Sequence, residues 1–264
     1  MIDNCSTDDT TKLIEKKYPE VMLIRSEDNL GFGKANNLGI SKAIEMGASH
    51  LFLMNQDARV APDTIQKLAD VICTRKDIGI ISPVHLNWSG DKLDFRFSSY
   101  IRFSGQKSRN SDFIPLSFVN AAFWMVPSEV FNIVGGFDTI FYHYGEDIDW
   151  INRCCYWGFV VGYCPNAIAY HDREFRVISR EMSTHLEFVQ HLSFLKDINR
   201  SLYSAVIHGY GGLLSKIFES LIFKPKEILS YISIFRKLVS FLPKSLKHRK
   251  LCVHSKGTPV FIVG

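Results

Sequence analysis

The chain has 264 residues, of which 46% are hydrophobic and 22% charged, and this composition predicts a water-soluble protein with a sizeable core. Six cysteines without regular spacing disfavour a disulfide-stapled secreted domain and a zinc site, and indicate reduced thiols in a cytoplasmic protein. The net charge of +4 is unevenly divided, because residues 199–250 carry ten Lys and Arg against two Asp and Glu, whereas residues 1–198 carry 20 against 25.

Strands and helices alternate along the first part of the chain. Short apolar runs bounded by polar or proline residues predict strands, and N-cap side chains and closing glycines predict helices. The predicted strands are 1–4, 21–24, 49–54 and 78–83, and the predicted helices are 6–18, 34–46 and 62–73. Alternation at this spacing predicts βαβ units and a largely parallel sheet.

The pattern changes after Pro83. Residues 85–115 are polar and aromatic without a clear period, which predicts strands and a mobile loop around 105–112. Further strands are predicted at 118–126, 160–164 and 167–170, further helices at 128–134 and 147–157, and continuous helical structure from 178 to about 250. We therefore expect an α/β domain over residues 1–178 and a basic helical extension over residues 179–264.

Polar residues follow two of the predicted strands. Asp3 ends the opening strand, and Asn55-Gln56-Asp57 directly follows the strand 49–54. Ligands of open α/β sheets bind beyond the carboxyl ends of the strands. The oxygen side chains of Asn55 and Asp57 suit Mg²⁺ or Mn²⁺, which would bridge to a substrate diphosphate. The alternative is an Asx-type turn that caps the strand.

Two other features lie at the ends of predicted elements. His171 follows the strand 167–170 and is either a metal ligand or phosphate contact, or a surface histidine. The glycine-rich turn 29–33 precedes Lys34 and could approach a phosphate through its backbone N–H groups. It is not a P-loop, because no Gly-Lys-Ser/Thr triplet follows.

Three carboxylates fall within four residues, at Glu146, Asp147 and Asp149, in a segment otherwise rich in aromatic side chains. Charge in such surroundings is costly to desolvate. Two carboxylates held close together push their pKa values apart, so that one can accept a proton near neutral pH while the other stays ionised. The cluster therefore predicts a catalytic base with a supporting acid. The alternative is a helix N-terminus whose acids favour the macrodipole.

The order of four motifs is more specific than any one of them. The motifs are Ile2-Asp3-Asn4-Cys5-Ser6-Thr7-Asp8, the segment 29–39 that begins Asn29-Leu30-Gly31-Phe32-Gly33-Lys34, Asn55-Gln56-Asp57, and the segment from Gly136-Phe137-Asp138 to Asp149. This order resembles family 2 glycosyltransferases, which have the GT-A nucleotide-diphospho-sugar transferase fold, an α/β fold with a Rossmann-like mixed, mostly parallel sheet. The resemblance covers about residues 1–175 and is strongest to the bacterial rhamnosyltransferase-like branch. Members of the family normally open with a further strand and helix before the position of Asp3, so the chain as given is expected to lack them.

The resemblance implies a role for each matching residue. Asp3 would contact the nucleotide base, and the other residues beside the donor would be Asn29, Lys34, Asn37 and Asn55. In the DxD-type motif, Asp57 would hold Mg²⁺ or Mn²⁺ on the diphosphate, and His171 would complete the metal or diphosphate shell. Asp147 would be the general base with Glu146 as its neighbour, and the residues on the acceptor side would be Asp149 and Trp150.

The function implied by the resemblance is that of an inverting glycosyltransferase. It would move a sugar, rhamnose in the branch that the chain resembles, from a dTDP- or UDP-linked donor to a saccharide or lipid-linked acceptor in bacterial cell-surface polysaccharide synthesis. One alternative is a truncated, non-catalytic relative that binds sugar or protein. Another is a nucleotidyltransferase, which can share the fold but would need a glycine-rich, basic N-terminal loop that the sequence lacks.

The basic segment 199–250 mixes apolar and basic residues at near-helical spacing. Its apolar residues that could form helix faces are Phe218, Leu221, Ile222, Ile228, Ile232, Phe235, Leu238 and Leu242. No apolar run is long enough to span a bilayer, so the pattern predicts a helix pair lying on an anionic membrane surface, at the inner face of the plasma membrane. The alternative is helices that pack on the catalytic domain with a solvated basic face. Nucleic acid is not expected as a partner, because no binding motif accompanies the charge.

Overall fold

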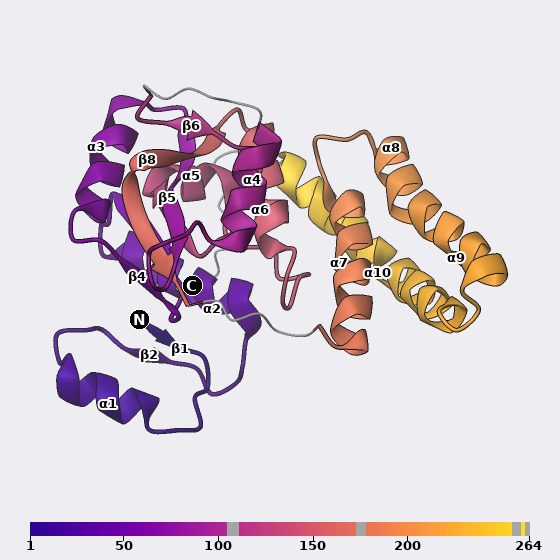
Figure 1. Ribbon diagram of the computed structural model, residues 1–264, viewed down its shortest axis with the longest axis horizontal. Coiled ribbons are helices and arrows are strands. Elements are labelled where there is room, and N and C mark those ends of the chain that lie inside the picture. The colour runs from indigo at the N-terminus through magenta and orange to yellow at the C-terminus, as the bar shows by residue number, and fades with distance from the viewer. Residues whose placement is uncertain (105–110, 173–177, 255–259, 262–264) are drawn as a thin grey trace.

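A six-stranded sheet forms the centre of the computed structural model, which describes residues 1–104, 111–172, 178–254 and 260–261 (Figure 1). The strand order is β3-β7-β5-β8-β4, and β6 also pairs with β8. The strands are β3 (His50–Met54), β4 (Ala58–Val60), β5 (Ile78–Asn87), β6 (Ile114–Pro115), β7 (Phe123–Pro127) and β8 (Val160–His171). β5 and β8 are parallel, whereas β7 runs antiparallel between β3 and β5, so the predicted α/β sheet is mixed in its pairing.

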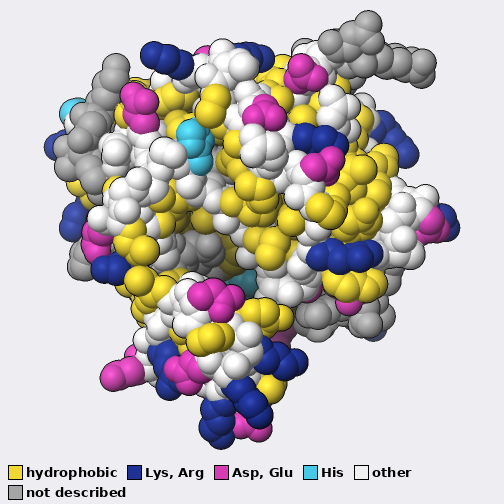
Figure 2. Space-filling view, turned by 90° about the vertical axis from the view of Figure 1, so that its left-hand side faces the viewer, with side chains coloured by type: hydrophobic (Ala, Val, Ile, Leu, Met, Phe, Trp, Pro, Cys, Tyr) yellow, Lys and Arg dark blue, Asp and Glu magenta, His cyan; other side chains and the backbone are white. Residues whose placement is uncertain are grey.

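A separate two-stranded sheet lies at the start of the chain. It pairs β1 (Ile2–Asp3) in parallel with β2 (Ile24–Arg25), and α1 (Thr10–Lys17) connects the two strands. Together they form a small lobe at the lower left of Figure 1, below the main sheet. Figure 2 shows that the surface is hollowed between this lobe and the main body.

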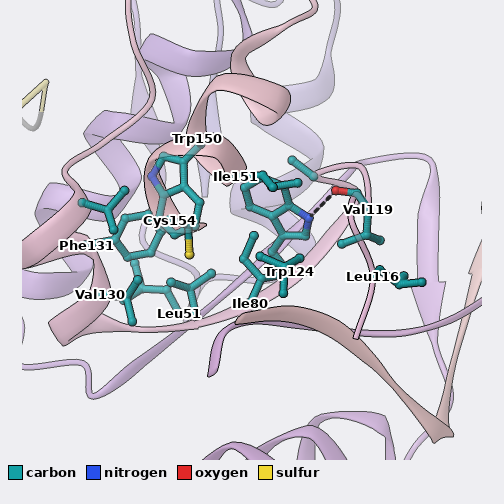
Figure 3. Close-up of a cluster of buried hydrophobic side chains, with 14 of the residues drawn as sticks. Leu51, Ile80, Leu116, Val119, Trp124, Val130, Phe131, Trp150, Ile151 and Cys154 are labelled. Carbon is teal, nitrogen blue, oxygen red and sulfur yellow. Dashed lines mark hydrogen bonds between the residues drawn. The ribbon is translucent and has the colours of Figure 1, made fainter. Parts of the chain in front are cut away.

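Five helices pack around the main sheet. They are α2 (Gly31–Glu45), α3 (Thr64–Thr74), α4 (Phe95–Ser104), α5 (Ser128–Val134) and α6 (Glu146–Tyr156). The core beneath them contains Trp124 and Trp150, both fully buried (Figure 3). The indole N–H of Trp124 donates to the carbonyl of Val119 at 3.2 Å, so the only polar atom of this ring is satisfied inside the core.

Several elements differ from the sequence predictions for identifiable local reasons. Helix α4 was not predicted; it begins after Asp94, whose carboxylate accepts the N–H of Phe97 at 2.9 Å. The two strands predicted at 160–164 and 167–170 are one strand, β8, because a shift in its register with β5 accommodates Pro165. Of the loop predicted at 105–112, residues 105–110 lie outside the described residues.

The extension beyond residue 178 is helical, as predicted, where the structure describes it. Its elements are α7 (Arg180–Lys196), α8 (Leu202–Val206), the π-helical turn η1 (Ile207–Gly211), α9 (Gly212–Phe223) and α10 (Ile228–His254). Side chains of α7 and α10 form a buried apolar cluster with Ile140 and Phe141 of the first domain, and this cluster includes Leu238. In the described parts of the chain, none of the helices combines the length and the apolar character needed to cross a bilayer.

Candidate functional site

Asp57 and His171, the two predicted metal ligands, lie side by side. Strand β4 pairs antiparallel with β8 so that Ala58 faces His171, which places Asp57 at the end of β8. The Oδ1 atom of Asp57 is 3.4 Å from Nε2 of His171. The imidazole is buried against the Phe123 ring, while the carboxylate remains 44% exposed. A fixed imidazole beside an accessible carboxylate is a donor pair suited to one divalent cation.

Asp57 and His171 together supply few ligands, which fits a cation that is also coordinated by the substrate of the protein. Among the described residues there is no cluster of three or more His, Cys, Asp and Glu side chains with metal-binding geometry. Mg²⁺ commonly uses one or two protein carboxylates together with substrate phosphates and water, and Mn²⁺ accepts carboxylate and imidazole ligands. Asn55 is half-buried at the end of β3, and its N–H donates to the carbonyl of Ala122 at 3.1 Å.

The loop before α2 is tied to the end of β1 by two asparagines. Oδ1 of Asn4 accepts the N–H of Leu30 at 2.8 Å, and Oδ1 of Asn29 accepts the N–H of Gly31 at 3.0 Å. The two side chains also bond to each other, with 3.1 Å between Nδ2 of Asn4 and Oδ1 of Asn29. These bonds satisfy N–H groups at the helix start, so α2 begins at Gly31 rather than at Lys34 as predicted. Lys34 is exposed in the first turn.

Asp3 is buried at the end of β1, beside this loop. Its Oδ2 atom accepts the N–H of Ser6 at 3.3 Å. The neighbouring Cys5 has a φ of 68°, a conformation that non-glycine residues rarely adopt, and its thiol donates to the carbonyl of Glu27. The chain therefore turns sharply just after Asp3, which brings Asn4 and Asn29 together.

The first turn of α2 packs directly on residues 136–149, the acidic segment. Gly31 has a φ of +74°, and a Cβ there would lie 2.3 Å from the carbonyl oxygen of Tyr142. A Cβ on Gly33 would lie 3.1 Å from Cβ of Phe137 and 3.8 Å from Cβ of Glu146. The glycines of this turn thus permit a close approach between two segments of the protein. As a result, the glycine-rich turn and the segment 136–149 meet at the N-terminus of α2.

Two consecutive residues with positive φ position the start of α6. Tyr144 has a φ of 66° and Gly145 a φ of 89°, and a Cβ on Gly145 would clash with Val189 and Phe141. The helix then begins at Glu146, with Asp147 in its first turn. The interpretation as an acidic helix N-terminus is therefore geometrically correct, but the strained turn before it is typical of a functional segment.

Glu146 and Asp147 differ sharply in their surroundings. The Glu146 side chain is 6% exposed, and its Oε2 atom has no hydrogen-bond partner among the described residues. Burial, assisted by the charge of Asp147, raises the pKa of Glu146 to about 8. Asp147 is half-exposed, and its Oδ1 accepts the N–H of Ile148 at 2.8 Å. The pair thus has one carboxyl held protonated at neutral pH and one that faces solvent.

The raised pKa of Glu146 predicts a stability that falls with rising pH. The folded protein keeps this proton up to about pH 8, whereas the unfolded chain releases it near 4.5. The free energy of unfolding should therefore decrease from pH 4.5 to 8, by at most about 1.4 kcal/mol per pH unit from this group. Urea denaturation of Glu146→Gln should show a flatter pH profile over that window. Identical slopes for the variant and the wild type would contradict the burial of this carboxyl.

Asn37, which was predicted to lie near the nucleotide, has a structural role instead. Its side chain is 5% exposed; Oδ1 accepts the N–H of Phe137 at 2.7 Å, and Nδ2 donates to the carbonyls of Phe137 and Phe261, each at 2.9 Å. Both polar atoms are thus used within the protein. Asn37 holds the acidic segment against α2, and the structure gives no support to a direct nucleotide contact.

Asp149 and Trp150 were predicted on the acceptor side, but both point into the interior. Trp150 is fully buried, and its N–H donates to the carbonyl of Gly135 at 2.8 Å (Figure 3). Asp149 is 2% exposed and forms an ion pair of 2.8 Å with Arg153. Helical periodicity explains both corrections, because residues three and four positions after Glu146 lie on the same buried face of α6.

A buried ion-pair network joins this region to the extension. Nζ of Lys196, in α7, lies 2.7 Å from Asp138 and 3.7 Å from Asp149, and Nδ1 of His248, in α10, lies 2.7 Å from Asp138. Burial alone would raise the pKa of Asp138, but His248 and Lys196 hold it well below its usual range. Asp138, which belongs to the fourth sequence motif, therefore anchors helices α7 and α10.

Residues that the sequence predictions missed also border the acidic segment. Nε2 of His185, in α7, lies 2.8 Å from the carbonyl oxygen of His143, and the rings of Tyr144 and His185 are 6.4 Å apart. The hydroxyl of Tyr142 donates to the carbonyl of Asn29 at 3.3 Å. No local sequence signal marks His185, because it is more than forty positions from the residues that it contacts.

Comparisons with known proteins show which family and fold the chain resembles. The family model described as glycosyl transferase family 2 matches residues 1–134. An N-acetylglucosaminyl-diphospho-decaprenol L-rhamnosyltransferase of Mycobacterium tuberculosis is 25% identical over 215 residues, which cover 70% of this chain and 69% of that protein.

Solved structures show the same fold. TarS of S. aureus matches with a TM-score of 0.56 at 15% identity, over 96% of this chain. GalNAc-T7 with UDP, GalNAc and Mn²⁺ matches with a TM-score of 0.52 at 15% identity, over 72% of this chain. This chain spans 46% of the first and 41% of the second. The mannosyltransferase PcManGT from Pyrobaculum calidifontis, in complex with GDP-Man and Mn²⁺, matches with a TM-score of 0.51 at 13% identity, over 99% of this chain and 74% of its own. The predicted GT-A fold is therefore confirmed.

Proposed function

The chain belongs to glycosyl transferase family 2, and on that premise we propose that it transfers a sugar, rhamnose by similarity to its mycobacterial relative, from a nucleotide-diphosphate donor to a lipid-linked saccharide acceptor. Donors with dTDP or UDP are the first to test. The observation that carries the proposal is the packing of the α2 N-terminus on Glu146, 3.8 Å from the Cβ position of Gly33. This contact brings the proposed donor side and the proposed acceptor side into one site.

On the donor side, the roles follow from position and exposure. Asp3, Asn29, Asn55 and exposed Lys34 would bind the nucleotide diphosphate, with Lys34 at the positive end of α2. Asp57 and His171 would hold Mg²⁺ or Mn²⁺. When bound, this cation would offset the charge that develops on the departing nucleoside diphosphate.

On the acceptor side, Asp147 would act as the general base. Its carboxylate is half-exposed, and it would take the proton of the acceptor hydroxyl as that oxygen attacks the anomeric carbon. Attack from the face opposite the leaving group inverts the configuration. Protonated Glu146 would donate a hydrogen bond rather than add a second negative charge near the attacking oxygen.

A lipid-linked acceptor places the enzyme at a membrane surface, where we propose that the turn between α9 and α10 makes peripheral contact. This turn lies far from the central sheet in Figure 1. Large apolar side chains of the two helices that flank the turn are strongly exposed, with Phe218 at 67%, Ile222 at 74%, Phe223 at 77% and Leu229 at 76%. Lys224 and Lys226 stand between them in the sequence, which suits an anionic surface at the inner face of the plasma membrane. Leu238 and Phe235 pack in the helical core instead.

Titration with Mn²⁺ and a panel of UDP- and dTDP-sugars tests the donor half of the proposal. The wild type should bind at least one nucleotide sugar in the presence of Mn²⁺ and lose most of that affinity with EDTA. Asp57→Asn should weaken Mn²⁺-dependent binding at least tenfold, because it removes the charged ligand. A matched control is Asp172→Asn, since Asp172 directly follows His171 in the sequence. Nucleotide binding that is the same with EDTA and in Asp57→Asn would contradict the metal site.

A further inference from the structure

A groove of about 410 Å³ lies between α7 and α10. Its lining residues are Arg180, Glu181, Thr184, His185, Phe188, Ser230, Ser233, Ile234 and Lys237. Phe188 and Ile234 are buried and form an apolar floor, and three hydroxyl groups and two cations stand around it. This combination of cations and hydroxyls over an apolar floor suits a ligand that carries both phosphate and hydrocarbon.

Both cations remain available to a ligand. Nη2 of Arg180 donates to the carbonyl of Lys226 at 2.9 Å and to the hydroxyl of Ser230 at 3.4 Å, which fixes the guanidinium but uses only one of its nitrogens. Nζ of Lys237 lies 4.2 Å from the centre of the Phe188 ring. Within the described ranges, no carboxylate lies within ion-pair distance of Arg180 or Lys237.

The groove extends from the α9–α10 turn toward the segment that precedes the proposed catalytic base. At one end, Arg180 bonds to Lys226, which lies in the turn between α9 and α10. At the other end, His185 contacts the backbone of His143, three residues before Glu146. Arg180 and His185 are five positions apart on α7, a rise of about 7.5 Å at 1.5 Å per residue. That length is comparable to a diphosphate group, so a sugar linked to it would extend past His185 toward the acidic segment.

We propose that this groove binds the diphosphate of an isoprenoid-diphosphate-linked acceptor, and this inference rests on the proposed function. Arg180 and Lys237 neutralise the phosphate oxygens, and the hydroxyls of Ser230 and Ser233 donate to them. The hydrocarbon leaves the groove toward the exposed apolar side chains at the α9–α10 turn. The sugar at the opposite end of the diphosphate reaches Asp147.

The order of chemical groups favours an isoprenoid diphosphate over a bulk phospholipid. The two cations lie between the exposed apolar side chains beside the α9–α10 turn and the acidic segment. In an isoprenoid-diphosphate-linked sugar, the phosphates likewise lie between hydrocarbon and sugar. A bulk phospholipid has no sugar to present to Asp147. Glu181, which also lines the groove, opposes an anion, and Glu181→Gln should therefore strengthen binding.

Farnesyl diphosphate is a suitable probe, measured by calorimetry with the full-length chain. The wild type should bind it, and the double variant Arg180→Gln/Lys237→Gln should bind at least tenfold more weakly. Arg236→Gln is the matched control, because it removes an exposed cation next to Lys237 on the same helix, outside the groove lining. This control should stay within twofold of the wild type. Equal losses in the control and the double variant would overturn the proposal, as would a wild type that binds no farnesyl diphosphate.

Two further experiments are needed. The first distinguishes a diphosphate bound in the groove from a phospholipid headgroup, and the second distinguishes this proposal from the proposed function. Phosphatidylglycerol vesicles should sediment the double variant as well as the wild type, because the α9–α10 turn makes that contact. A parallel loss of vesicle binding would assign the cations to a general anionic surface and overturn the groove. Asp57→Asn should keep full affinity for farnesyl diphosphate. If the wild type binds this probe but no nucleotide sugar, the proposed function fails while the groove stands.

Discussion

Asp147→Asn should lower the rate of sugar transfer by a factor of about 10² to 10⁴, because a positioned general base contributes that much to proton transfer. The half-exposed carboxylate in the first turn of α6 lies beside the junction of α2 and the acidic segment. Asparagine keeps the size and can still accept the N–H of Ile148, which the carboxylate accepts at 2.8 Å. The helix start should therefore survive, and only the proton acceptor is lost.

The measurement is release of nucleoside diphosphate in the presence of the acceptor, with the donor identified by the Mn²⁺ titration. Affinity for the nucleotide sugar should change less than threefold, so the loss should fall on kcat rather than on the KM for the donor. Glu129→Gln is the matched control, because Glu129 is also an exposed acid in the first turn of a helix, α5. It should keep full activity. Turnover retained in Asp147→Asn would remove this residue from the role of base.

The pair of Glu146 and Asp147 shows what the sequence could and could not predict about the site. Three acids in four residues indicated two carboxyls with different pKa values, and the structure raises the pKa of Glu146 to about 8. The cause is burial beneath the start of α2, which depends on Gly33 more than a hundred positions earlier. Local patterns predict the helix and its acids, but they do not contain the distant segment that removes water from one of them.

Asn37 and Asp149 show a limit of prediction from family resemblance. Family resemblance assigned both to ligand contacts, yet both are buried and fully engaged with the protein. A polar residue in a motif can serve the ligand or the scaffold that holds the ligand, and sequence spacing does not distinguish the two. Helical phase would have helped for Asp149, which shares a face with Arg153 at i,i+4 spacing. The hydrogen bonds of Asn37 to Phe137 span a hundred positions and have no local signature.

The alternating strands and helices of the first part were predictable because each apolar run is local and bounded by turn residues. The place of β7 in the sheet was not, since this strand inserts between β3 and β5 from a position about forty residues beyond β5. The docking of the extension was equally invisible, because its polar anchors lie in segments far apart in the sequence. The sequence left open whether the basic helices pack on the first domain; the structure shows that α7 and α10 do, and that the turn between α9 and α10 stays exposed.

Lys196→Met should destabilise the whole protein by about 3–5 kcal/mol, because it removes the ammonium that the buried carboxylates of Asp138 and Asp149 share. Burial alone would lower the pKa of Lys196, but the charges of Asp149 and Asp138 outweigh it and raise the pKa, so the ammonium is charged in the folded state. Methionine fills a similar volume, so lost packing should contribute little. Urea denaturation followed by tryptophan fluorescence reports on Trp124 and Trp150 in the first domain.

Lys247→Met is the control, since Lys247 is exposed on α10 next to His248, and its loss should cost less than about 0.5 kcal/mol. Asp138→Asn in the Lys196→Met background should cost less than the sum of the two single changes, because it removes the stranded charge and keeps the acceptor for the N–H of Ile140. If Lys196→Met left the tryptophan transition unchanged, the extension would unfold independently of the first domain. The acceptor groove between α7 and α10 would then lack a fixed position relative to Asp147, because this buried network and the apolar cluster around Phe141 help to hold α7 against the acidic segment.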